Sequence, residues 1–513
     1  MLDNSLNNKR IAKNTLLLYI RMLLTMSVTL YTSRVVLLVL GVEDFGVYNV
    51  VGGIVSMFAF INGGMVAATQ RYITFEIGTG NIERLNKVFS TSLQIHAIIS
   101  ILIIILGETV GLWFLVEKMV IPEDRMTAAM WVYQCSVIAC VVNIMSIPYN
   151  ADIIAHEKMS AFAFISVIDV VMKLLIVYLL KFSSFDKLIV YAILLLIVQF
   201  SIRLFYTTYC KNHFEESTYT NIFDKKLIRE MSGFAGWSFW GSLAGVLYTQ
   251  GVNMMLNIFF GPAVNAARGI AVQVQSAVQQ FVVNFQMALN PQITKSYAID
   301  NLEQMHSLMF RSARFSFILL FFITLPVLLE TNFLLTLWLK IVPDNTVIFT
   351  QIMLCIALIY TIANPCIIAN QATGKVKIYQ AVVGGILLSI LPISYIVLEL
   401  GAPAYSVFVV HFFVESVAQF FRMFMLRKLI NLPMWEYMKN IYVPIVSTVV
   451  ISVILPIFVH MQYPEGWYRF IVVGFTSALS VGVTSLFVGI TRHERMFLLG
   501  KGIQLLRIKN DKS

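Results

Sequence analysis

The chain has 513 residues, of which 58% are hydrophobic and only 12% are charged, and its mean hydropathy is +0.79. Because soluble proteins carry about 25% charged residues, this composition excludes a soluble globular protein and indicates a helical membrane protein with many spans. The net charge of +10 does not predict a nucleic-acid partner, since the basic residues gather in the connections between apolar segments.

Fourteen apolar segments are long enough to cross a membrane as helices. We expect an N-terminal bundle of six helices in residues 1–210, a cytoplasmic linker in 211–232 and a second six-helix bundle in 233–428. Two extra helices are expected in 429–490, followed by a basic cytoplasmic tail in 491–513. The expected spans are 14–40, 47–70, 88–116, 126–150, 160–181, 187–209, 233–260, 264–290, 308–339, 346–370, 376–399, 402–427, 439–462 and 467–490.

The second half of the chain repeats the first at an offset of 220 residues. Without a gap, Gly41 aligns with Gly261, and the identical pairs continue through Ser92 and Ser312. Six spans separate the two copies, so both copies enter the membrane in the same direction. This pattern predicts two bundles related by a parallel pseudo-twofold axis, a plan typical of alternating-access transporters.

Lysine and arginine predict how the chain is oriented in the membrane. Most of them lie in one set of connections and in the two ends of the chain, whereas the opposite set holds only Lys118, Arg125, Lys181, Lys187, Lys340 and Arg469. The positive-inside rule therefore places both termini in the cytoplasm. No cleavable signal peptide is expected, because the first apolar run contains Arg21 and Arg34 and lacks a small-x-small cleavage site.

Arginines inside the spans are candidate functional residues, because a charge in the membrane is costly. Arg21, Arg34 and Arg268 have no acidic residue within two helical turns, so their partners must lie elsewhere. Three guanidinium groups facing a cavity between the bundles would suit a phosphate or pyrophosphate. The alternative is that Arg21 and Arg34 extend toward the two membrane surfaces.

Two further groups of charges occur within the spans. Asp169 and Lys173 are spaced i, i+4, which favours a structural ion pair over a proton or cation site. Glu415 is a second candidate for ion coupling, and it shares a helix face with Arg422. No spacing of His, Cys and carboxylates predicts a metal site, and the five cysteines are expected to be core residues.

The span at 264–290 is unusually rich in amides, including Gln273, Gln280 and Asn284. Such a helix cannot face lipid. Its amides either line a cavity that binds hydroxyl-rich sugars or hydrogen-bond to other helices. Breaks in the helices are expected near Pro148, Pro326, Pro365, Pro392, Pro444 and Pro456. The chain contains no Walker A motif and no catalytic-triad signature, so we expect neither an ATP-driven pump nor an enzyme, and no cofactor.

Three short stretches resemble the bacterial polysaccharide flippases of the multidrug, oligosaccharidyl-lipid and polysaccharide exporter superfamily. They are TSRVVLLVLGVEDFGVY at residues 32–48, AATQRY at 67–72 and NPQI at 290–293. The chain departs from the usual pattern at residues 261–265, where it reads GPAVN instead of a second Gly-x-Tyr.

The resemblance implies a fourteen-helix flippase of the bacterial inner membrane. Such a protein moves an undecaprenyl-pyrophosphate-linked oligosaccharide to the outer leaflet, for example for O-antigen and lipopolysaccharide, capsule or exopolysaccharide synthesis. It keeps arginines in a central cavity, and Arg21, Arg34 and Arg268 lie in the matching helices. The implied partners are the lipid-linked substrate, membrane lipids, and a polysaccharide polymerase with other assembly proteins. The alternatives are a cation-coupled multidrug antiporter with the same fold and a non-transporting scaffold for glycan synthases.

Overall fold

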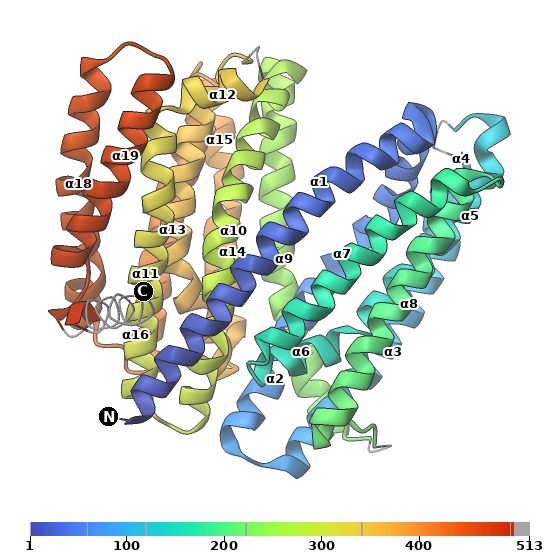
Figure 1. Ribbon diagram of the computed structural model, residues 1–513. Helices are drawn as coiled ribbons and strands as arrows, with labels where there is room; N and C mark the ends of the chain where they lie inside the picture. The colour runs from blue at the N-terminus through green and yellow to red at the C-terminus, as the bar shows by residue number, and fades with distance from the viewer. Residues whose placement is uncertain are drawn as a thin grey trace, which may run out of the picture. The chain divides into compact units, whose positions relative to one another are not determined.

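The structure, a computed structural model, describes residues 2–58, 60–117, 119, 121–220, 223–339, 342–492 and 494–496. Within these ranges all regular secondary structure is helical, which confirms the predicted all-α class (Figure 1). Eleven helical stretches of the described chain are long and apolar enough to cross a membrane. They match every expected span except 14–40, 47–70 and 264–290, whose described residues are nevertheless helical. Residues 497–513, most of the expected basic tail, lie outside the described residues.

The chain forms two compact units. The N-terminal unit comprises Met1–Leu243, Thr294–Asn301 and Gly374–Ala381, and the C-terminal unit comprises Ala244–Ile293, Leu302–Thr373 and Val382–Ser513. Two short segments from the second half of the chain therefore pack with the first half. One is fixed by Lys295, whose ammonium lies 3.0 Å from the buried carboxylate of Glu157.

The N-terminal unit is built from α1 to α8 and the first part of α9. α1 runs alongside α7 (Figure 1), α2 packs on α6, and α5 packs on α8. The bounds are α1 Leu2–Phe58, α2 Phe60–Thr79, α3 Ile82–Leu106, α4 Leu112–Glu117, α5 Met126–Ile144, α6 Ile147–Ala155, α7 Met159–Phe182, α8 Lys187–His213 and α9 Lys225–Phe260. A π-helical turn, η1 (Gly107–Gly111), joins α3 to α4, and the 3-10 turns η2 (Glu123–Arg125) and η3 (Glu215–Ser217) precede α5 and follow α8.

One arginine ties together three segments at one end of the N-terminal unit. Arg125 donates to Asp44 Oδ1 at 2.7 Å and to Asp186 Oδ2 at 2.6 Å. Asp44 follows the kink of α1 at Gly41, and Asp186 caps the first turn of α8. The acidic position in the 32–48 motif thus has a structural role in this unit. We call the opposite end, which carries Arg84, Lys87, Lys158, Lys211 and Lys295, the basic end.

The C-terminal unit contains the rest of α9 and α10 to α19, except for the end of α10 from Thr294 and the start of α14 up to Ala381. The bounds are α10 Pro262–Ala298, α11 Leu302–Leu329, α12 Thr331–Leu339, α13 Thr346–Thr373, α14 Val376–Leu388, α15 Ile390–Glu399, α16 Ser406–Leu429, α17 Met434–Tyr437, α18 Val443–Gln462 and α19 Trp467–Thr484. The π-helical turns η4 (Met438–Tyr442) and η5 (Ser485–Gly489) precede α18 and follow α19. Its core includes Phe349 and Phe408, whose ring centroids lie 4.6 Å apart.

Several helix boundaries differ from the expected ones. The expected break near Pro148 is present between α5 and α6, and Ser389 separates α14 from α15 just before Pro392. A proline ring clashes with the carbonyl four residues earlier, which explains the second break. Pro326 and Pro365 are instead accommodated inside α11 and α13. α10 also continues through Pro291 to Ala298, beyond the expected end at residue 290.

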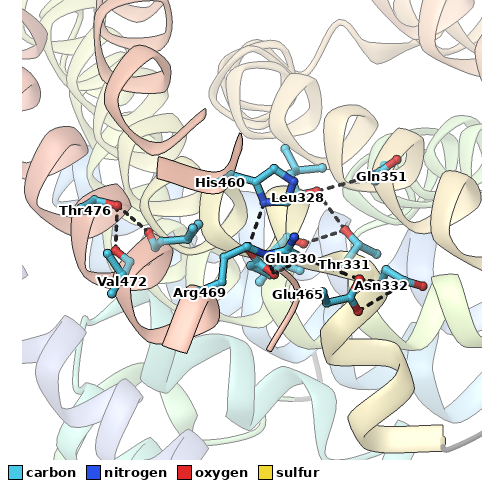
Figure 2. Close-up of polar contacts among 12 residues, drawn as sticks. Leu328, Glu330, Thr331, Asn332, Gln351, His460, Glu465, Arg469, Val472 and Thr476 are labelled. Carbon is cyan, nitrogen blue, oxygen red and sulfur yellow. Dashed lines mark hydrogen bonds and ion pairs between the residues drawn. The ribbon is translucent and has the colours of Figure 1, made fainter. Parts of the chain in front are cut away.

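A buried carboxylate fastens the α18–α19 hairpin to the rest of the C-terminal unit. Figure 2 shows Glu330, at the break between α11 and α12, facing His460 and Arg469. Glu330 Oε1 lies 3.0 Å from His460 Nδ1 and 2.9 Å from Arg469 Nε, and the Glu330 side chain is fully buried. Asn332 donates to Glu465 Oε1 at 3.0 Å in the same cluster. The two added helices are therefore held by specific ionic contacts as well as by apolar packing.

Candidate functional site

A cavity of about 870 Å³ lies inside the N-terminal unit. It is lined by residues of α1, α2, α5, α6, α7 and α8, so most helices of the unit contribute to it. Its charged lining residues are Arg21, Asp169 and Lys173, three of the residues singled out from the sequence. The structure thus brings together two of the predicted candidate groups, which lie on different helices.

Arg21 extends from α1 toward α7. Its Nη1 donates to Ser166 Oγ at 3.4 Å, and its Cζ lies 4.7 Å from the centroid of the Phe162 ring. Ser166 in turn donates to the carbonyl of Phe162 at 2.8 Å, which leaves its oxygen directed to Arg21. The guanidinium is therefore held in place by a hydroxyl and an aromatic face, and it remains part of the cavity wall.

Asp169 and Lys173 form the ion pair that their spacing predicts. Lys173 Nζ lies 2.8 Å from Asp169 Oδ2, and the two side chains are 36% and 25% exposed, respectively. The charged lining residues are therefore two basic residues and one acidic residue, and the acidic residue is paired with Lys173.

Uncharged polar groups make up much of the remaining wall. The amides of Gln70, Asn143, Asn150 and Gln199 line it, together with hydroxyl groups that include Tyr206. Asn150 Nδ2 donates to the Tyr206 hydroxyl at 3.2 Å. None of these four amides was expected as a site residue. Gln70 belongs to the AATQRY motif, and the other three amides had no signal beyond being polar residues within or at the end of an apolar span.

Chemically, the cavity offers one fixed guanidinium and many groups that can both donate and accept hydrogen bonds. A guanidinium matches the oxygens of a phosphate, and amides and hydroxyls match the hydroxyl groups of sugars. The volume lies within the range of about 300–1,000 Å³ that is usual for small-molecule sites.

The other predicted arginines are not part of this cavity's described wall. The side chain of Arg34 lies outside the described residues. Arg268 belongs to the C-terminal unit, where it donates to the carbonyl of Thr249 at 3.0 Å and to Asn253 Oδ1 at 3.3 Å. Both acceptors are on α9, so Arg268 links α10 to α9.

The amides of α10 are divided between exposed and buried positions. Gln273 and Gln280 are exposed, whereas Asn284 is buried and donates to the carbonyl of Gln280 at 2.8 Å. Gln286 is also buried, and it donates to Ser316 Oγ and to the carbonyl of Thr361, both at 3.1 Å. The buried amides therefore make hydrogen bonds within α10 and to neighbouring helices.

Glu415, the second candidate for ion coupling, forms a buried ion pair in the C-terminal unit. Arg422 Nη1 lies 2.7 Å from Glu415 Oε1, and neither side chain is more than 5% exposed. One turn earlier on α16, His411 makes an edge contact with the ring of Tyr248 at 5.2 Å. Arg422 is therefore paired and buried within the C-terminal unit.

The fold is that of solved multidrug transporter structures. A crystal structure of MATE in the bent conformation superimposes with a TM-score of 0.71 at 12% identity, over 84% of this chain and 97% of the other. A multidrug resistance MATE family transporter of the MOP superfamily in an outward-facing conformation gives 0.67 at 14% identity, over 82% and 96%. A MOP superfamily transporter from Pyrococcus furiosus, described as having a binding pocket of reversed polarity and a different function, gives 0.61 at 14% identity, over 82% and 96%. The sequence matches no family model, and no curated protein matches it significantly.

Proposed function

We propose that this multi-pass membrane protein is a flippase for lipid-linked oligosaccharides, in which the cavity of the N-terminal unit binds the pyrophosphate and the first sugars. The observation that carries the proposal is the composition of the cavity wall. Its charged side chains are two basic residues, Arg21 and Lys173, and one acidic residue, Asp169, and its other polar groups are mainly amides and hydroxyls. An anionic, hydroxyl-rich headgroup matches such a wall better than an organic cation does.

The fold supports a transporter, because the solved structures that share it are transporters. The proposed substrate is an undecaprenyl-pyrophosphate-linked unit for a surface polysaccharide such as O-antigen. Alternating exposure of the cavity would carry the headgroup across the bacterial inner membrane, while the polyprenyl tail stays in the lipid. The proposed orientation places both termini and the basic end in the cytoplasm, where the substrate is made. A polysaccharide polymerase and other assembly proteins are the proposed partners downstream.

A cation-coupled multidrug antiporter is the second candidate, because Asp169 lines the cavity and could attract a cation. Its carboxylate is, however, already paired with Lys173 at 2.8 Å. A cationic drug would have to displace this lysine and would also approach Arg21. Both effects disfavour cation binding.

Flipping by the purified protein tests the proposal directly. The protein is reconstituted into liposomes with a fluorescent, short oligosaccharide linked to a polyprenyl pyrophosphate, and loss of accessible label is followed with time. We expect flipping by the wild type and at least a tenfold lower rate for Arg21→Ala. Arg203→Ala removes a half-buried arginine of α8 that is not part of the cavity wall, so it should flip normally.

Two outcomes would contradict the proposal. Proton-driven uptake of an organic cation without flipping would favour the antiporter. Neither activity in well-inserted protein would favour a scaffold that does not transport. Equal rates for Arg21→Ala and Arg203→Ala would show that the cavity of the N-terminal unit is not where the headgroup binds.

A further inference from the structure

We propose that the basic end of the N-terminal unit contains a zinc site formed by Asp152, His156 and Glu216. Donor atoms of the three side chains lie within 4.8 Å of one another. Asp152 and His156 belong to the last turn and the C-cap of α6, and Glu216 lies in η3, 60 residues further along the chain. No metal site was expected from the sequence, because Glu216 joins the other two residues only in the folded chain.

The positions of Asp152 and His156 on α6 suit a tetrahedral zinc ion. The i, i+4 spacing places both side chains on one face of the helix end, and His156 Nε2 lies 3.7 Å from Asp152 Oδ1. Ligand atoms around a tetrahedral zinc at about 2.0–2.2 Å lie roughly 3.3–3.6 Å apart. These two ligands therefore need little movement to bind.

Glu216 closes the site from the opposite side. Its Oε1 lies 2.5 Å from His156 Nε2, which is a hydrogen-bond distance. A bound metal would replace the proton in this contact and separate the two atoms by about 1 Å. Burial would raise the pKa of the Glu216 carboxyl, but the hydrogen bond from His156 outweighs this effect and holds that pKa below its ordinary value.

Asp152 has one carboxylate oxygen that could serve as a metal ligand. Its side chain is fully buried, and Oδ2 accepts a hydrogen bond from Ser217 Oγ at 2.6 Å. Oδ1, which faces His156, accepts no hydrogen bond of normal geometry among the described residues. Buried polar oxygens are seldom left without a partner. A cation between Oδ1, His156 and Glu216 would provide one.

Charge also favours a divalent cation at this position. The cluster combines two buried carboxylates with one imidazole, and no Lys or Arg of the described chain forms an ion pair with either carboxylate. Glu157, the residue after His156, is directed to Lys295 instead. Like charges in a buried site are unfavourable, and a divalent ion would neutralise both carboxylates. One nitrogen and two oxygen ligands suit zinc better than magnesium or calcium, which prefer oxygen ligands alone.

The surroundings hold the ligands in position. The ring of His156 stacks on Phe214, with centroids 4.1 Å apart and planes 7° apart. From α3, Asn86 donates to the carbonyls of Glu216 and Thr218 at 3.0 and 2.9 Å, which fixes the segment that carries Glu216. Cys210 directs its thiol to the carbonyl of Tyr149 at 3.4 Å and is not one of the proposed ligands. Zinc would thus join the α6–α7 turn to the segment that leads from α8 into α9.

The test uses the full chain in detergent, stripped with a chelator and then titrated with zinc alone. We expect close to one zinc per chain, and at least a tenfold loss of affinity in Asp152→Asn and in Glu216→Gln. Zinc should also raise the unfolding temperature of the wild type but not of these variants.

In zinc-free buffer Asp152→Asn should be at least as stable as the wild type, because it removes a buried charge next to Glu216 and keeps an oxygen for Ser217. Glu215→Gln and His213→Ala are matched controls, since both residues are exposed and adjacent to the site.

A second measurement needs no variant. Zinc should slow hydrogen exchange of the wild type in residues 152–158 and 214–220, and not elsewhere. Absence of zinc binding at micromolar concentrations, or protection confined to other segments, would overturn the proposal. So would equal zinc affinity in Glu216→Gln and Glu215→Gln, which would indicate an adventitious ion only. The result bears on this site alone, because it does not depend on which substrate the protein moves.

Discussion

Gly41 and Gly261, which are 220 positions apart in the sequence, adopt the same unusual backbone conformation, with φ of 83° and 81°. The same offset relates Gly80 and Asp300, which have φ of 73° and 57°. The repeat inferred from residue identities is thus reproduced in two backbone features of each copy. Each glycine lies where one membrane helix gives way to the next: Gly41 inside α1 and Gly261 between α9 and α10.

Replacing Gly41 by alanine should destabilise the protein through the backbone alone. An added Cβ would meet no atom within 4 Å, but φ of 83° with ψ of 169° is a region that other residues avoid. We expect a loss of about 1–3 kcal/mol in the free energy of unfolding, measured as a lower unfolding temperature in detergent. Gly233→Ala is the control, because it also has free space but lies in regular helix in α9. It should be neutral or slightly stabilising. Equal effects of the two substitutions would refute this account.

Arg469 should be critical for attaching the α18–α19 hairpin. Arg469→Ala leaves the fully buried Glu330 carboxylate with His460 alone, and loss of one partner of a buried pair costs about 3–5 kcal/mol. Arg469→Ala combined with Glu330→Gln should recover much of this loss, because no unpaired charge remains. Thermal unfolding of the wild type, both single variants and the double variant measures the coupling. Strictly additive effects would show that the two side chains do not stabilise each other.

The sequence predicted the helical class, the approximate spans and the Asp169–Lys173 pair, because these depend on local spacing. It did not predict which polar groups share the cavity wall. Asn143, Asn150 and Gln199 are spread over α5, α6 and α8, and only tertiary packing brings them together with Arg21.

The amides of α10 are a second feature whose role could not be predicted from the sequence. Their number shows that the helix does not face lipid, but it does not distinguish a binding surface from interhelical hydrogen bonds. Gln286 turned out to bond to Ser316 and Thr361, acceptors on two other helices. Nothing in the sequence of α10 identifies those acceptors. The exposed Gln273 and Gln280 remain predicted substrate contacts.

The Asp169–Lys173 pair distinguishes a flippase from a proton- or cation-coupled antiporter. If the pair is structural, the double variant Asp169→Asn with Lys173→Met should keep at least half of the wild-type flipping rate, because it removes one positive and one negative charge together and leaves Arg21 in the cavity wall. Replacing both partners leaves no unpaired charge, so the double variant should also fold. Loss of all transport in a well-folded double variant would instead assign a coupled proton or cation to Asp169.

Two variants can separate the contact that Arg268 makes with α9 from a role of Arg268 in binding the pyrophosphate. Arg268→Ala removes a guanidinium and also the link from α10 to Thr249 and Asn253 on α9. Asn253→Ala removes only the side-chain part of that link, while the carbonyl of Thr249 still accepts from Arg268. If Arg268 binds the pyrophosphate, Arg268→Ala should insert normally and abolish flipping, whereas Asn253→Ala should retain most of it. Arg268→Lys should restore little activity, because a lysine cannot reproduce the bidentate contact with phosphate. If Asn253→Ala lowers flipping as much as Arg268→Ala does, the arginine acts by holding α9 and α10 together, and binding of the headgroup is left to Arg21 and the cavity of the N-terminal unit.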